Sequence, residues 1–142
     1  MRTLIVRAAV LTLLPLMLAS CGRSEPTGPR VFFVQPQDGA TVKSPVRLEF
    51  GVENYQVAAV PAGTVTESRP NIGHHHVGVD ADCLPPGTAI PRAAPWVHFG
   101  DGKNVIDMQL PPGQHRLTLQ IGDDLHRTQE GLCSTITVNV EG

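Results

Sequence analysis

Hydrophobic and polar residues alternate along four stretches of the chain, which is typical of β-strands that bury one face. The residues predicted to point inward are Val46, Leu48, Phe50 and Val52; Ile106, Met108 and Leu110; His115, Leu117, Leu119 and Ile121; and Ile136, Val138 and Val140. No stretch after residue 20 shows the 3.6-residue period of an amphipathic helix. The pattern therefore predicts an all-β protein.

Shorter apolar runs add strands at residues 31–34, 57–60 and 96–100, and in the last of these we expect Val97 and Phe99 to face the core. Glycine and proline separate the strands about every ten residues, residues 84–95 are proline-rich, and residues 122–131 are predicted to be a loop. About seven short strands with this spacing predict an immunoglobulin-like antiparallel β-sandwich.

The first 20 residues have the features of a secretory signal peptide. Arg2 and Arg7 precede an apolar run, and the run ends in Leu-Ala-Ser followed by Cys21. This ending resembles a lipoprotein box, which implies cleavage before Cys21 and acylation of its side chain. The expected organisation is a signal peptide (1–20), a flexible tether (21–29) and one β-sandwich domain (30–142).

Acyl chains on Cys21 would anchor the protein to a membrane. By resemblance to lipoproteins, glycine at position 22 implies the outer membrane, with the domain facing the periplasm. Removal of Arg2 and Arg7 leaves nine Lys and Arg against thirteen Asp and Glu, a net charge of −4. This balance provides no basic face, so nucleic acid is not an expected partner.

Two cysteines remain in the domain, Cys83 and Cys133. In an oxidising compartment such a pair is expected to form a disulfide. The alternatives are thiolate metal ligands or a redox pair, but no Cys-x-x-Cys spacing supports either.

Three consecutive histidines open the strand-like stretch Asn71 to Asp82. Because side chains alternate along a strand, His75 should point inward with the valines that follow, and His74 and His76 should share the opposite face. Their Cα atoms would lie roughly 6.5 Å apart, which suits two ligands of one metal ion. The alternative is a structural role, in which these histidines are only hydrogen-bonded.

Further ligands are available elsewhere in the chain. His98 lies on the strand face opposite Val97 and Phe99 and is the best third ligand, and His126 or Asp80 is a candidate fourth. His115 is expected to be structural and hydrogen-bonded. Imidazole nitrogens suit copper or zinc. A calcium site built from aspartates is a further alternative, although aspartates are common in turns for backbone reasons.

The chain also resembles a known family of exported bacterial proteins, the domain of unknown function 4399. The motifs that carry the resemblance are Val31-Phe32-Phe33-Val34, Asp38-Gly39-Ala40, Ser44-Pro45-Val46, Gly73-His74-His75-His76, His98-Phe99-Gly100, Leu110-Pro111-Pro112-Gly113 and Gly122-Asp123. They extend over most of residues 31–140. The resemblance implies an exported protein and no established activity, and Cys83 and Cys133 are not part of the family pattern.

Enzyme motifs such as Gly-x-Ser-x-Gly or a phosphate-binding loop do not occur in the sequence. The function that the sequence favours is a lipid-anchored domain that binds copper or zinc through its histidines. A non-catalytic structural or protein-interaction module of the cell envelope is the alternative, and a metalloenzyme is a third.

Overall fold

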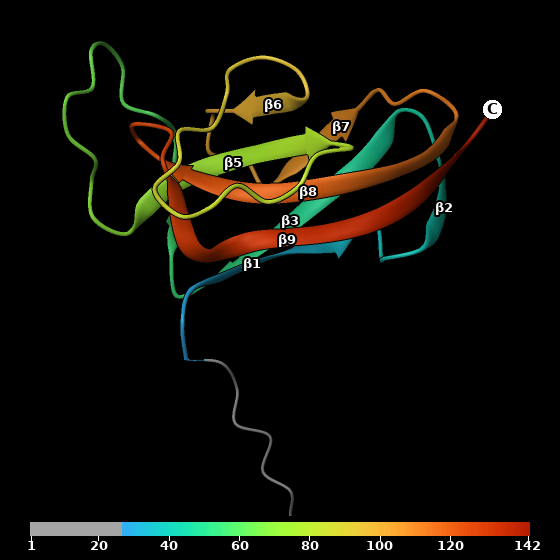
Figure 1. Ribbon diagram of the computed structural model, residues 1–142, viewed down its shortest axis with the longest axis horizontal. Coiled ribbons are helices and arrows are strands. Elements are labelled where there is room, and N and C mark those ends of the chain that lie inside the picture. Colours follow the sequence, from blue (N-terminus) through green and yellow to red (C-terminus); the bar gives the residue numbers. More distant parts are fainter. Residues whose placement is uncertain (1–26) are drawn as a thin grey trace, which may run out of the picture.

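A computed structural model describes residues 27–142, which form nine strands in two sheets (Figure 1). The strands are β1 (Arg30–Gln35), β2 (Ala40–Lys43), β3 (Val46–Glu53), β4 (Gln56–Val57), β5 (Ile72–Val79), β6 (Trp96–Phe99), β7 (Val105–Met108), β8 (Gly113–Asp123) and β9 (Thr128–Glu141). In this part of the chain there is no helix long and apolar enough to cross a membrane. The expected signal peptide, Cys21 and most of the tether lie outside the described residues.

The two sheets pack face to face as a β-sandwich. The smaller sheet has the order β1-β3-β7, and the larger has the order β2-β9-β8-β5-β4, with β6 also paired to β5. All pairs are antiparallel except β2–β9 and β4–β5, which are parallel. The predicted β-sandwich is confirmed, but its larger sheet is mixed. The sequence pattern missed this because β2 and β4 are edge strands of four and two residues.

The core lies between the sheets and is built from the alternating positions of the long strands. On β3, Val46, Leu48 and Phe50 are buried, and on β8, Leu117 and Leu119 are fully buried. Met108 and Leu110, and Ile136, Val138 and Val140, are buried as well, as the alternation predicts. Apolar burial of this kind is the main stabilising contribution to the fold.

The outer face of the larger sheet is also covered, which the sequence did not predict. The segment 80–95 crosses this face. Thr118 donates a hydrogen bond to the Ala81 carbonyl (2.5 Å), and the Gln120 amide is hydrogen-bonded to both the N–H and the carbonyl of Leu84. Thr118 and Gln120 are therefore buried and satisfied although they point away from the core.

Two local predictions are wrong. Val97 is 37% exposed, whereas Trp96 is buried over Gly78 on the outer face. Strand β6 lies at the edge of the larger sheet, so the core does not extend to Val97, and the large ring of Trp96 takes the covered side. The predicted loop 122–131 is instead a tight turn at residues 124–127 between two long strands, β8 and β9.

The predicted disulfide is confirmed. Cys83 and Cys133 are joined with their Cα atoms 6.1 Å apart, and the bond ties the covering segment to β9. The bond closes a loop of 50 residues, so we expect Cys83→Ser with Cys133→Ser to lower the free energy of unfolding by about 4 kcal/mol. Urea denaturation of both proteins measures this loss. An unchanged midpoint and slope would contradict it.

Candidate metal centre

Strand β5 separates its three histidines between the two faces of the larger sheet. His75 points into the core, is 1% exposed, and lies with its ring centroid 4.8 Å from that of Phe50. Its Nδ1 is 3.0 Å from the carbonyl oxygen of Lys103. Because a carbonyl only accepts, Nδ1–H donates this bond. His75 is thus placed inward, as the alternation of the strand predicts.

His74 and His76 lie on the opposite face and are 0% and 1% exposed. His76 is the cross-strand neighbour of His98 on β6, and their ring centroids are 5.1 Å apart. His74 is opposite Gly122 on β8. A Cβ on Gly122 would lie 2.9 Å from the Cε1 atom of His76, so the absence of a side chain there leaves room for the imidazoles.

His126 joins them from the turn between β8 and β9. Its backbone is left-handed, with φ of 63°, and its N–H donates to the Asp123 carbonyl (2.8 Å). The Asp123 carboxylate also accepts hydrogen bonds from the backbone N–H groups of Leu125 and Arg127. These bonds fix the turn in a conformation that directs the His126 ring toward β5.

The four histidines form a compact cluster, which we call the histidine cluster: His74, His76, His98 and His126. One ring nitrogen from each lies within 4.8 Å of the others, and the ring centroids are 4.6 to 5.5 Å apart. Around zinc, at Zn–N distances of about 2.0–2.1 Å, four tetrahedral nitrogens lie roughly 3.3 Å from one another. The cluster therefore needs only a small contraction to surround one ion.

The ring nitrogens of His74 and His76 are the least satisfied polar atoms of the cluster. All four are buried and lack a hydrogen-bond partner among residues 27–142. Buried polar atoms in folded proteins are normally paired, because an unpaired one costs about 1–3 kcal/mol. Two imidazoles held without partners, facing two further imidazoles, are the arrangement that a metal ion would satisfy.

The electrostatics keep the cluster neutral at pH 7. Burial lowers the pKa of His74 to about 4, helped by His126 and His98. Burial, with the nearby His74 and His98, lowers the pKa of His76 to about 2. Burial and Arg92 lower the pKa values of His98 and His126 as well. Since only neutral imidazole can ligate, these shifts preserve ligand capacity well below pH 6.5.

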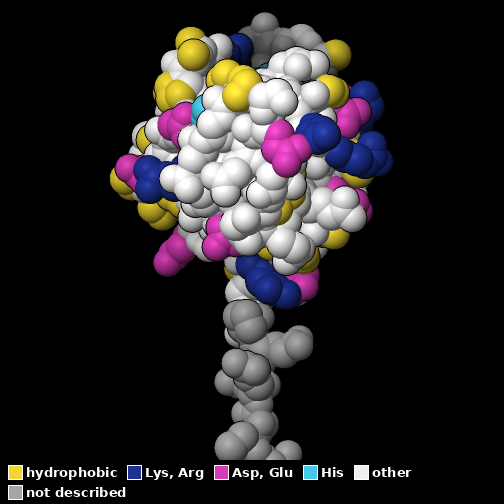
Figure 2. Space-filling view, turned by 90° about the vertical axis from the view of Figure 1, so that its right-hand side faces the viewer, with side chains coloured by type: hydrophobic (Ala, Val, Ile, Leu, Met, Phe, Trp, Pro, Cys, Tyr) yellow, Lys and Arg dark blue, Asp and Glu magenta, His cyan; other side chains and the backbone are white. Residues whose placement is uncertain are grey.

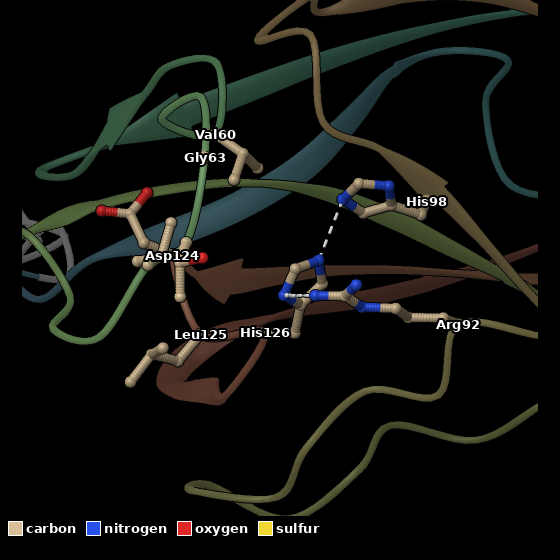
Figure 3. A pocket seen from close by; sticks show the side chains of 9 residues that line it. Val60, Gly63, Arg92, His98, Asp124, Leu125 and His126 are labelled. Carbon is tan, nitrogen blue, oxygen red and sulfur yellow. Dashed lines mark hydrogen bonds between the residues drawn. The ribbon is translucent and has the colours of Figure 1, made fainter.

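A pocket of about 520 Å³ opens onto the cluster and is lined by Arg92, His98, Asp124 and His126, among others (Figure 3). His98 is the exposed member of the cluster, so the pocket is its approach from solvent. Figure 2 shows histidine reaching the surface only as a small patch on the face drawn there, and side chains of both charges are scattered over that face.

An ion pair holds the far wall of this pocket. The carboxylate of Asp124, 2% exposed, accepts hydrogen bonds from the Arg69 guanidinium at both oxygens (2.8 Å each) and from the Arg69 backbone N–H (3.0 Å). These bonds hold the pKa of Asp124 below its usual value. The same bonds fasten the loop before β5 to the His126 turn, and Arg69 also donates to the Ala59 carbonyl within that loop.

The other candidate residues from the sequence lie apart from the cluster. Asp80 accepts a hydrogen bond from Nδ1 of His115 (2.9 Å) and another from the Arg116 backbone, so it is not positioned as a fourth ligand. His115 is partly buried and also bonded to the Pro111 carbonyl, the structural role expected for it. Asp82 pairs with Arg116. The four aspartates of the calcium alternative, Asp80, Asp82, Asp123 and Asp124, are thus each bonded to other groups of the protein.

The role of His75 can be tested apart from the cluster. We expect His75→Ala to lower the free energy of unfolding by about 2–4 kcal/mol, because it removes packing against Phe50 and a buried hydrogen bond. Chemical denaturation of metal-free protein measures the loss. If the variant kept wild-type stability, the inward, structural assignment of His75 would be wrong.

Comparison with known proteins adds one match. Residues 48–141 match the family model described as a domain of unknown function (DUF4399). No curated protein and no solved structure matches the chain. The matched region contains the whole histidine cluster and both cysteines of the disulfide.

Proposed function

The chain belongs to the DUF4399 family, and we propose that its function is to bind one transition-metal ion, copper(II) or zinc, in the histidine cluster. The observation that carries the proposal is the set of four buried, unpartnered ring nitrogens on His74 and His76 within the described residues. His98 and His126 bring the number of imidazole ligands to four.

The chemistry of the donor set favours these metals. Imidazole is a good ligand for copper(II) and zinc. Among residues 27–142 no free sulfur ligand of the kind that selects copper(I) is present, since Cys83 and Cys133 are oxidised and Met108 is in the core. Four protein ligands are typical of sites that hold a metal rather than use it, because catalytic zinc keeps an open position. We therefore propose a binding module rather than an enzyme.

Calorimetric titration of purified, untagged protein with zinc and with copper(II) tests the proposal. We expect one ion per chain, and equilibrium competition between the two ions identifies the preferred metal. Affinity should be retained as the pH passes through 6.5 and should fall only at lower pH, because the lowered pKa values of the four histidines delay the competition from protons. Failure of both ions to bind would leave the structural alternative, in which the histidines only complete the fold.

We also propose that the domain is attached to the outer membrane through acylated Cys21 and faces the periplasm. The support is the Leu18-Ala19-Ser20-Cys21 sequence after an apolar run, together with a disulfide, which belongs to an oxidising compartment. Mass spectrometry of the mature N-terminus should find an acylated Cys21. An unmodified terminus at another residue would refute the attachment.

A further inference from the structure

Arg92 donates a hydrogen bond to a ring nitrogen of His126, and a metal ion bound to His126 would break this bond. Its guanidinium is 3.2 Å from His126 Nδ1, and His126 Nε2 is 3.1 Å from His98 Nε2 (Figure 3). A guanidinium only donates, so Nδ1 must be the acceptor. In the neutral ring the proton is then on Nε2, which donates to His98.

This proton arrangement is incompatible with a metal at His126. If Nε2 ligates the ion, its proton is transferred to Nδ1, where it meets the N–H groups of Arg92, donor against donor. If Nδ1 ligates the ion instead, Arg92 is displaced directly. With a neutral imidazole ligand, either route separates Arg92 from His126. Arg92 is an exposed side chain of the segment 80–95, so it is free to move into the adjoining pocket.

The charges of the pocket then favour an anion. Four neutral imidazoles leave the double positive charge of the ion uncompensated, and the released Arg92 adds another positive charge. Asp124 does not offset them, because both of its oxygens are held by Arg69. The exposed position of His98 places the ion next to the pocket, whose volume of about 520 Å³ is ample for a small molecule.

We propose that metal binding displaces Arg92 from His126 and creates, in this pocket, a site for a small carboxylate or oxyanion held between Arg92 and the metal ion, which the anion would join as a fifth ligand beside the four imidazoles. The inference rests on the proposed metal site. Carboxylates suit it because a guanidinium binds them with two parallel hydrogen bonds. The protein would then bind metal and anion together, each increasing the affinity for the other.

The test uses untagged protein loaded with cobalt(II) as a spectroscopic substitute for zinc, titrated with acetate at constant ionic strength, with neutral acetamide as the control ligand. We expect acetate, and not acetamide, to change the visible spectrum. Arg92→Gln should weaken acetate binding by about 10- to 100-fold, the effect of losing a charge-assisted hydrogen bond, and Arg92→Lys should restore part of it. Arg47→Gln, which removes a charge on the distant strand β3, should leave it unchanged.

Displacement of Arg92 has a second readout, the affinity for the metal alone. Arg92→Gln removes a competing donor and a positive charge. The affinity of this variant for cobalt(II) should therefore equal that of the wild type or exceed it by up to about tenfold. If the metal binds but acetate leaves the spectrum unchanged, or if Arg92→Gln binds acetate as well as wild type, the anion site is wrong and the metal site stands. If cobalt(II), zinc and copper(II) all fail to bind, both proposals are wrong.

Discussion

Replacing His74 and His76 together by alanine should lower the affinity for zinc or copper(II) by more than about 100-fold. Loss of a group that merely supports a ligand already costs 10- to 100-fold, and this variant removes two ligands outright. Each of the two side chains also carries unpartnered ring nitrogens, one of which the ion would bind. Calorimetric titration of metal-free wild type and variant measures the change.

Two single variants serve as controls for this experiment. His115→Ala removes a histidine of β8 that is bonded to Asp80 and lies outside the cluster, so metal affinity should not change. His75→Ala should lose stability and keep metal affinity within about threefold. Equal affinity in wild type and in the double variant would refute the four-histidine site. Equal losses in His115→Ala would indicate a general effect of removing imidazole.

Acidification from pH 7 to pH 5 should destabilise the metal-free protein by about 4 kcal/mol through His74 and His76. The folded-state pKa values of these residues are lowered to about 4 and about 2, below the value of 6.5 expected in the unfolded chain. Below pH 6.5 the unfolded state therefore binds more protons than the folded state, and stability falls as the pH falls. Each group contributes about 2 kcal/mol over this interval.

His115 has the opposite sign. Its hydrogen bond to Asp80 raises its pKa, so its contribution to stability is complete below pH 6.5 and is lost as the pH rises through the folded-state value. Urea denaturation of wild type and of the His74→Ala, His76→Ala double variant at pH 7 and pH 5 separates the contribution of His74 and His76 to the free energy of unfolding from that of other groups. The double variant should lose much less stability on acidification. Parallel losses in the two proteins would show that His74 and His76 are not the source.

Much of the site followed from the alternation of side chains along single strands. That rule placed His75 inward and His74 with His76 outward, and it put His98 on the face opposite Phe99. Strand pairing could not be read from the chain, but the predicted grouping requires only that β6 lie beside β5, as it does.

Other features depend on packing between distant segments. His126 reaches the cluster because a left-handed turn, held by Asp123, replaces the loop predicted at residues 122–131. Ile90, on the covering segment 80–95, lies beside Gly122 and close to His76, and that segment has no hydrophobic period of its own. Arg92 belongs to the same segment, so its contact with His126 gave no sequence signal. Val97 is likewise exposed because β6 lies at the edge of the larger sheet, beyond the reach of the core.

X-ray absorption spectroscopy of the protein loaded with one equivalent of zinc or copper(II) tests the metal site most directly. We expect three or four imidazole nitrogens bound to the ion, at about 2.0–2.1 Å for zinc, with the multiple-scattering pattern of the rings and no sulfur. The same measurement on the His74→Ala, His76→Ala variant should show at most two imidazoles. An ion bound only by oxygen, or by two or fewer imidazoles in the wild type, would contradict the four-histidine site.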